Sequence, residues 1–575
     1  MTREHRRLAH IDYRWIALSN TSLSLLMAMV NGSVVLIALP SIFRGIGVNP
    51  LAPGESNYLL WMIMGYTLVT ATVLVTAGRI SDIFGRVRLY NAGFAIFTIG
   101  SILCFAVPGT GNTAALLLIV FRCIQGIGGA FLMANSAAIL TDAFPPNQRG
   151  FAMGVNQIAG LAGGFAGLLI GGVLSTVDWR AIFLLSVPFG IFGTVWAYLM
   201  LHETQKVRVH RGLDIRGNLL FAGGLTLVLV AFTYAIQPYG TSSTGWGNPW
   251  VIGELTGGIA LLALFVLNEL HVPDPMFHLE LFRIRAFTLG NIASFLAALS
   301  RGGLQFVLII WLQGIWLPLH GYSYEQAPLM AALFMLPLTV GFLVAGPVSG
   351  RLSDRHGAHL FATGGMVLSA VGFLGMLALP ADFSYMPFGA LLFVLGVSQG
   401  NFAAPNTTAV MNASPAEHRG VASGMRATFM NVGQSLSMTL MFTLVVTGLS
   451  SQLGPALLSR LTDVGVPASL AHQVAGIPPI GALFAAFLGS NPMGSLLPHA
   501  ALASLTPGAR NAVLANGFFP GILEGPFADG LKVAFIVCIG LSLLAAVASW
   551  HKPATPVHHP ALEDEPVAAI SDMVD

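Results

Sequence analysis

Apolar stretches about as long as a membrane-spanning helix recur along the whole chain of 575 residues. A helix that crosses the hydrocarbon core of a bilayer needs about 20 mainly apolar residues. Fourteen stretches meet this requirement: 17–42, 57–79, 90–108, 113–137, 150–176, 181–201, 213–236, 250–268, 286–316, 327–350, 358–380, 386–411, 418–450 and 530–550. The pattern predicts an all-α integral membrane protein with fourteen transmembrane helices.

One long segment, 451–529, does not fit this pattern. Its apolar run at 474–489 is short and contains Pro478 and Pro479, which would break a helix exposed to lipid. We therefore predict that the segment lies outside the membrane, with the apolar run resting on the membrane surface. A re-entrant segment is the alternative.

Composition agrees with a lipid environment, because hydrophobic residues make up 55% of the chain and charged residues only 9%. A soluble domain carries about a quarter charged residues. The three cysteines, Cys104, Cys123 and Cys538, lie in apolar runs and are expected to be buried thiols rather than disulfide partners or metal ligands. The sequence has neither a phosphate-binding loop nor a metal-ligand spacing, so we expect no enzyme activity, no metal and no cofactor.

The distribution of charge matters more than its sum. The net charge of +2 gives no indication of a nucleic-acid partner. If the N-terminus is cytoplasmic, most of the 26 Lys and Arg residues fall in cytoplasmic loops, as the positive-inside rule requires. We therefore expect both termini to be cytoplasmic in the inner (plasma) membrane. The histidines at 551–560 are then part of a soluble tail.

Two charged loops occur twice in the sequence. GRISDIFGRVR at 78–88 shares its glycines and aspartate with GRLSDRHGA at 350–358, and PPNQRGFAMG at 145–154 similarly matches PAEHRGVASG at 415–424. Two matches at nearly the same offset indicate a duplicated unit of six helices. Duplicated six-helix bundles are an arrangement typical of transporters.

The repeat predicts a division of the chain into an N-terminal six-helix bundle, an inserted helix pair and a C-terminal bundle. The predicted parts are the first bundle (1–201), the inserted pair with flanking cytoplasmic loops (202–285), the first five helices of the second bundle (286–450), an extracytoplasmic loop region (451–529), the last helix (530–550) and a cytoplasmic tail (551–575).

The chain resembles the major facilitator superfamily, and within it the fourteen-span drug:proton antiporter branch. The resemblance covers about 15–450 and 530–550. It rests on the repeated loop motif, on FRCIQGIGGA at 121–130, on DWRAIFLLSVPFG at 178–190 and on GGFAGLLIGG at 163–172, where Leu168 replaces the proline of the family motif. The resemblance implies alternating access and export of hydrophobic or amphipathic small molecules.

The resemblance also implies roles for two groups of residues. The repeated loops would form a latch that holds one conformation closed, made of Gly78, Asp82, Gly85, Arg86, Gly350, Asp354 and Gly357. Ordinary solvated turns are the alternative. The glycines of the fifth span would control the seal against leak, or simply allow close packing: Gly163, Gly167, Gly171 and Gly172.

Two arginines lie deep within predicted spans. A charged side chain is costly in lipid and usually faces a cavity or a partner. Arg122 shares a helix face with Gln125, and Arg301 precedes Gln305 by four residues, so we expect these four residues to line the pathway. The alternatives are snorkelling for Arg122 and, for Arg301, a local helix break at Gly302 and Gly303.

The first span departs from the family pattern, because Asn31 stands where the branch usually has an aspartate. An amide cannot take up a proton near neutral pH, and no carboxylate lies deep in any core span to replace it. We therefore place Asn31 in the pathway and leave proton coupling open. The arginines would favour neutral, anionic or amphipathic cargo over cations.

We expect a monomer in a lipid bilayer with a small-molecule substrate. Two alternatives to the exporter stay open. One is an uncoupled carrier that accepts anions or lipids, and the other is a membrane receptor or scaffold that does not transport.

Overall fold

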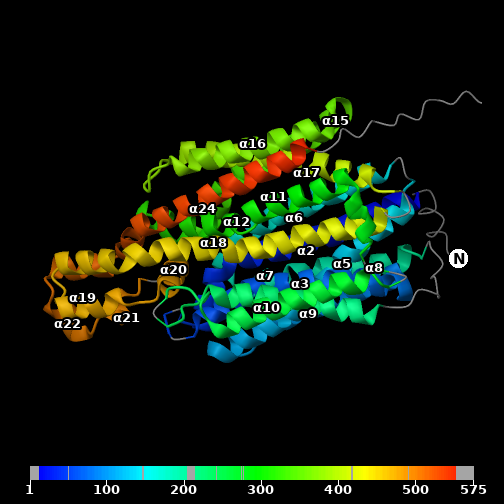
Figure 1. Ribbon diagram of the computed structural model, residues 1–575. Coiled ribbons are helices and arrows are strands. Elements are labelled where there is room, and N and C mark those ends of the chain that lie inside the picture. The colour runs from blue at the N-terminus through cyan, green and yellow to red at the C-terminus, as the bar shows by residue number, and fades with distance from the viewer. Residues whose placement is uncertain are drawn as a thin grey trace, which may run out of the picture.

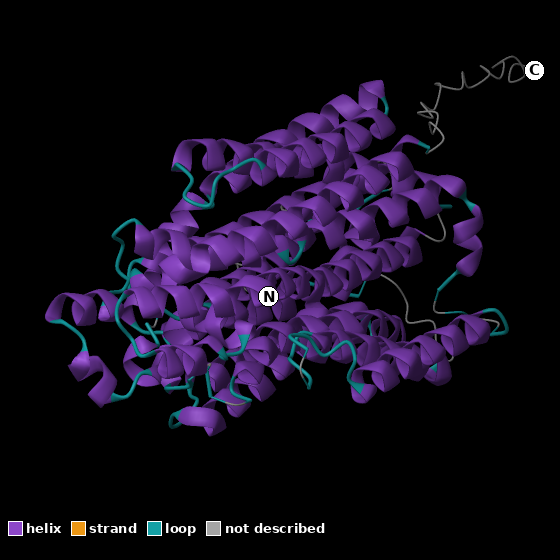
Figure 2. Ribbon diagram, turned by 60° about the vertical axis from the view of Figure 1, so that its left-hand side comes forward, coloured by secondary structure: helices purple, strands orange, loops and turns teal. Residues whose placement is uncertain are grey.

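The computed structural model describes residues 12–49, 51–52, 54–145, 148–203, 214–240, 242–272, 275, 277–415, 419–489 and 491–551. Within these residues the chain consists of helices joined by loops and has no strand (Figure 2). In this part of the chain, 14 helices are long and apolar enough to cross a membrane, so the predicted fold class is confirmed.

The first half of the molecule contains six spans. Their helices are α2 (Tyr13–Ile46), α3 (Ser56–Phe84), α4 (Arg86–Phe105), α5 (Gly111–Ala143), α6 (Arg149–Val177) and the pair α7 (Ala181–Leu184) and α8 (Ser186–Met200), which forms one span. The inserted pair follows as α9 (Ile215–Ala235) and α10 (Pro249–Glu269).

The second half begins after the short 3-10 helix η2 (Leu279–Arg283). Its first span is broken into α11 (Arg285–Arg301), α12 (Leu304–Ile310), the π-helical η3 (Trp311–Trp316) and α13 (Leu317–Leu319). The next helices are α14 (Ala327–Phe334), α15 (Leu336–His356), α16 (Ala358–Leu377), α17 (Tyr385–Ala413), α18 (Arg419–Asp463) and α24 (Phe518–Trp550).

The helices run side by side, and α2 begins and α24 ends toward the same end of the bundle (Figure 1). We call this the near end. The opposite, far end carries the short helices of the α18–α24 connection, and α19, α21 and α22 project from it in Figure 1. These short helices are α19 (Ala468–Ala475), α20 (Pro479–Phe487), α21 (Met493–Leu496), α22 (His499–Ser504) and α23 (Pro507–Leu514).

Helix α18 is 45 residues long and continues well past the predicted limit at 450. Beyond that limit Leu453, Leu457 and Leu461 are buried and recur every four residues, which places them on one face of the helix. Helix α24 likewise begins at Phe518, before the predicted start at 530. An apolar stripe therefore continues along α18 beyond the predicted span, and α18 also contacts α19.

Most of the apolar run at 474–489 is buried, from Ile480 onward. It is divided between α19 and α20, which meet at an angle of 88°. Every residue of α20 from Ile480 to Phe487 is buried, and α20 contacts η3, α18 and α24. The burial of α20 among these helices fits its apolar sequence, since a helix that is apolar on all sides is covered by protein. Whether the stretch is re-entrant stays a prediction.

Candidate functional site

Arg122 occupies the interior of the first half. Its Nη1 donates to Asn31 Oδ1 on α2 at 2.8 Å and to Gln125 Oε1 one turn along α5 at 3.2 Å. The side chain is only 2% exposed, and its Cζ lies 4.7 Å from the centroid of the Tyr66 ring of α3. The structure thus brings together the predicted residues Asn31, Arg122 and Gln125, with Arg122 buried rather than snorkelling.

Two serines extend this network across the first half. Gln125 Nε2 donates to Ser101 Oγ on α4 at 2.8 Å, and Asn31 Nδ2 donates to Ser186 Oγ on α8 at 3.5 Å. Sequence reasoning missed both serines, because a single serine in an apolar span gives no signal of its own. The network ties the central helices α2 and α5 to α4 and α8.

All hydrogen-bond acceptors of Arg122 are neutral amides, and none of the ion pairs among the described residues involves it. Its Nε has no hydrogen-bond partner in this part of the chain. An arginine stays protonated in proteins, and an amide has no proton to exchange near neutral pH. The pair therefore carries a fixed positive charge.

Arg301 is the last residue of α11, and its Nη1 donates to Gln399 Oε1 on α17 at 3.2 Å. Its side chain is partly buried. The predicted neighbour Gln305 lies on α12, beyond a two-residue interruption of the helix at Gly302 and Gly303. Gln399 was visible in the sequence as a polar residue within a span, but only tertiary structure identifies it as the partner.

The break after Arg301 follows from close packing against α18. A Cβ atom added to Gly302 would lie 2.9 Å from Gln434 Cα, which is closer than real Cβ contacts. Gly303 N donates to Ser437 Oγ on α18 at 2.8 Å. The partly buried arginine and the interruption of the helix therefore lie next to each other.

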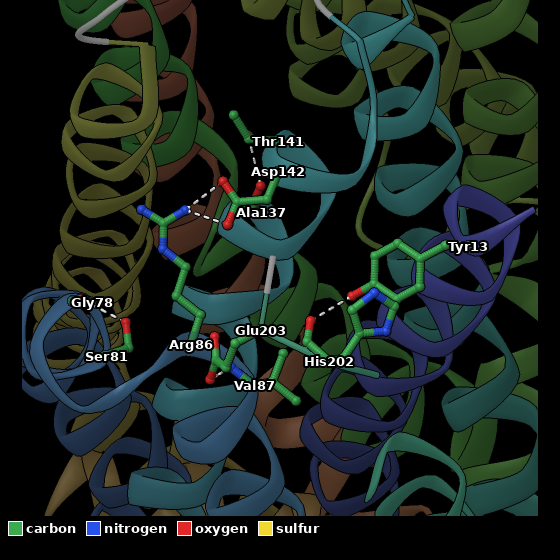
Figure 3. Close-up of polar contacts among 10 residues, drawn as sticks. All are labelled: Tyr13, Gly78, Ser81, Arg86, Val87, Ala137, Thr141, Asp142, His202 and Glu203. Carbon is green, nitrogen blue, oxygen red and sulfur yellow. Dashed lines mark hydrogen bonds and ion pairs between the residues drawn. The ribbon is translucent and has the colours of Figure 1, made fainter. Parts of the chain in front are cut away.

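The first predicted latch loop is joined to two carboxylates (Figure 3). Arg86 Nη1 donates to both carboxylate oxygens of Asp142, at 2.8 and 2.7 Å. Glu203 Oε1 accepts hydrogen bonds from Val87 N at 2.9 Å and from Arg88 N at 3.2 Å. These amides belong to the N-terminus of α4 and have no acceptor within the helix, so a carboxylate is favourable there. Asp142 and Glu203 were missing from the predicted latch.

The two latch loops share a backbone conformation. Gly85 and Gly357 have φ values of 105° and 94°, which L side chains rarely adopt. In each loop a serine donates to the carbonyl of the first glycine: Ser81 to Gly78 O at 2.6 Å and Ser353 to Gly350 O at 2.8 Å. The side chains of Asp82 and Asp354 lie outside the described residues, so their role in a latch stays a prediction.

The predicted gating glycines of α6 face two different neighbours. Gly163, Gly167 and Gly171 face α2, where an added Cβ would come within 3.0 Å of the backbone of Leu26, Val30 and Val34. Gly172 instead faces the second half, because its added Cβ would lie 2.9 Å from Leu329 Cα of α14. Three glycines therefore allow packing inside the first half, and one allows contact between the halves.

Comparison with known proteins assigns the chain to a family. The sequence profile of the Major Facilitator Superfamily matches residues 21–438. The chain is 29% identical over 558 residues to the tetracenomycin C resistance and export protein of Streptomyces glaucescens, an alignment that covers 96% of this chain and 94% of the relative. It is 27% identical to the multidrug resistance protein Stp of Mycobacterium tuberculosis, which aligns over 94% of this chain and 93% of its own length.

Solved structures show the same fold at low sequence identity. A bacterial homolog of the human lysosomal transporter Spinster, in an inward-facing and unoccupied conformation, superimposes with a TM-score of 0.54 at 15% identity and covers 95% of this chain and 99% of its own. A peptide transporter, POT, in complex with sulfate gives a TM-score of 0.55 at 14% identity, with coverage of 83% and 93%. The chain belongs to the major facilitator superfamily and is a multi-pass membrane transporter rather than an enzyme.

Proposed function

We propose that the protein exports hydrophobic or amphipathic small molecules across the inner (plasma) membrane by alternating access, with both termini in the cytoplasm. The observation that carries this proposal is the alignment, over nearly the whole chain, with a protein described by resistance and export and with a multidrug resistance protein. The alternating-access part is supported by the duplicated halves.

Contacts between the halves at the far end support this mechanism. One continuous buried cluster contains Ile37 of α2 and Ile63 of α3 together with Ala331 of α14 and Phe442 of α18. The close approach of Gly172 to Leu329 lies at the same end. In this conformation the two halves are therefore packed together at the far end, which would be extracytoplasmic.

The second candidate function is a carrier that accepts anionic or amphipathic cargo without proton exchange at Asn31. It is favoured by the two arginines whose hydrogen-bond acceptors in the described chain, Asn31, Gln125 and Gln399, are all neutral. A fixed positive charge without a nearby carboxylate attracts an anionic group and repels a cation.

Flux measurements with purified protein in liposomes distinguish these functions. We would compare ethidium, a cationic dye, with carboxyfluorescein, an anionic dye, with and without a pH gradient. Accumulation driven by the gradient supports a proton-coupled exporter, and gradient-independent flux of the anionic dye supports the second candidate. If neither these dyes nor a broad panel of amphipathic compounds moves, the protein is a receptor or scaffold and the proposal fails.

A further inference from the structure

The nine-residue helix α20 lies within the far end of the bundle, although it belongs to the connection between α18 and α24. Its sequence, PIGALFAAF, contains no polar side chain. A helix that is apolar on every side must be covered on every side. Here α20 contacts η3, α18, α24 and α3. We call the short helices α19 and α21–α23 the far-end cap.

Aromatic contacts hold α20 in the second half. The ring of Phe487 lies 5.7 Å from that of Phe306 on α12, and the ring of Phe484 lies 5.7 Å from that of Phe442 on α18. Beside them, a Cβ added to Gly314 of η3 would lie 3.0 Å from Phe487 N. Short π-helical stretches such as η3 are frequent at functional sites.

The helix also reaches the first half. Residues of α20 and α3 are in contact, and Leu483 and Phe484 belong to the same buried cluster as Leu60 and Ile63 of α3. A segment that packs on helices of both halves would hold the halves together at the far end for as long as it stays in place.

We propose that α20 is a plug that closes the far-end opening of the passage between the halves and withdraws each time that end opens. This inference rests on the proposed alternating-access function. If the halves separate at the far end, α20 must lose its packing against at least one of them. Its withdrawal would then be a step of each transport cycle.

The segments beside α20 are suited to such a movement. Pro478 marks the 88° corner with α19, and Gly489 follows α20 with a φ of 72°. The cap beyond is fastened separately, because Tyr324 Oη donates to Asn516 O at 2.6 Å and Asn491 Nδ2 donates to Val513 O at 2.8 Å. Burial raises the pKa of Tyr324 to about 12, so its hydroxyl remains a donor at physiological pH. The plug can therefore turn between two corners while the cap stays folded.

A reversible disulfide tests the proposal. In a background with Cys104, Cys123 and Cys538 replaced by alanine, we would introduce Gly314→Cys and Phe487→Cys, whose backbones are close enough for a disulfide. We expect oxidation to slow dye transport by about tenfold or more, as for a blocked gate, and reduction to restore it. The matched control is Ser300→Cys with Ser542→Cys, whose hydroxyl oxygens lie 3.1 Å apart and which joins α11 to α24 without touching α20. Oxidation of this control pair should leave transport nearly unchanged.

The outcomes separate the plug from the proposed function. If the reduced proteins transport none of the dyes, the export proposal fails. If the reduced proteins transport dye, and the variant with the oxidised 314–487 disulfide transports it at the same rate, only the plug proposal is refuted. Should that pair not fold, a single Leu483→Cys variant gives a second test with a membrane-impermeant maleimide added on the far side. Labelling over minutes, accelerated by a transported dye, supports withdrawal, and the absence of labelling during turnover contradicts it.

Discussion

Each half of the molecule places an arginine beside an amide, but the halves exchange the helices that carry them. In the first half the amide, Asn31, is on the first helix and the arginine, Arg122, is on the fourth. In the second half the arginine, Arg301, is on the first helix and the amide, Gln399, is on the fourth. The duplicated unit therefore keeps the contact between its first and fourth helices while reversing the direction of the hydrogen bond.

The surroundings of the two arginines differ more than their partners do. Arg122 is almost fully buried, has two amide acceptors and lies against the ring of Tyr66. Arg301 is only partly buried, has a single hydrogen bond of 3.2 Å and stands at a helix break. The comparison suggests a division of roles, in which Arg122 fixes the packing of the first half and Arg301 is freer to meet cargo.

The largest effect is expected from Arg122→Ala. The substitution leaves Asn31 and Gln125 without their donor and opens a cavity, which costs about 2–4 kcal/mol of stability. We expect little dye transport and a clearly lower melting temperature of the purified protein. Arg122→Lys is the control, since it keeps the charge but loses the planar fork. A melting temperature unchanged in Arg122→Ala would contradict the structural role.

Arg301→Gln should change selectivity more than stability. Removing this charge should slow anionic dye flux by about tenfold, which corresponds to about 1.4 kcal/mol, while ethidium flux stays nearly constant. Flux of both dyes and the melting temperature would be measured in parallel. Gln399→Leu is the control, because it removes the partner and keeps the charge. If the flux of both dyes is slowed equally, Arg301 does not discriminate between cargo molecules by their charge.

Asn31→Asp should introduce a pH dependence that the native residue cannot have. The ionised carboxylate would form a strong pair with Arg122 and slow the conformational change by a few-fold at neutral pH. The pair with Arg122 lowers the pKa of the aspartate, so only below about pH 4 does it become neutral like asparagine and let the rate return toward that of the unsubstituted protein. The measurement is the ratio of the initial rate of the variant to that of the unsubstituted protein from about pH 3 to pH 8. A ratio that does not change with pH would refute the fixed-charge interpretation of Asn31.

The smallest effect on stability is expected from substitutions in the near-end loops, which also differ between the halves. Asp142 of the first half pairs with Arg86, whereas the corresponding positions in the second half are Asn412 and Ala358. Arg86→Ala and Asp142→Asn should show a coupling energy of about 1 kcal/mol in a double-mutant cycle of unfolding. The same cycle with Asn412→Ala and Ala358→Gly should give no coupling. If the destabilising effects of Arg86→Ala and Asp142→Asn are simply additive, the ion pair does not contribute to stability.

Much of the fold could be predicted because it depends on local properties of the chain. The length of each apolar stretch indicates a helix that crosses the bilayer, and the repeated loops indicate the duplication. The position of α20 could not be predicted in this way, since Pro478 and Pro479 exclude a lipid-exposed helix but say nothing about a protein-covered one. Its burial depends on surfaces supplied by α3, η3 and α18.

The candidate site was predictable to a similar degree. Arg122 stood out as a charge deep in an apolar span and Asn31 as a departure from the family pattern, and the structure brings them into contact. The interrupted relation between Arg301 and Gln305 was not visible, because the break depends on the approach of α18 to Gly302 and Gly303.

The sequence by itself determined that this protein is a duplicated bundle of fourteen apolar helices with arginines, such as Arg122, inside its spans. Helix length, hydrophobicity and the cost of a buried charge act within a single span, so they can be read from consecutive residues. Only the tertiary structure decided which neutral group each arginine contacts and where α20 lies. Those outcomes depend on hydrogen bonds and packing between residues that are far apart in the chain.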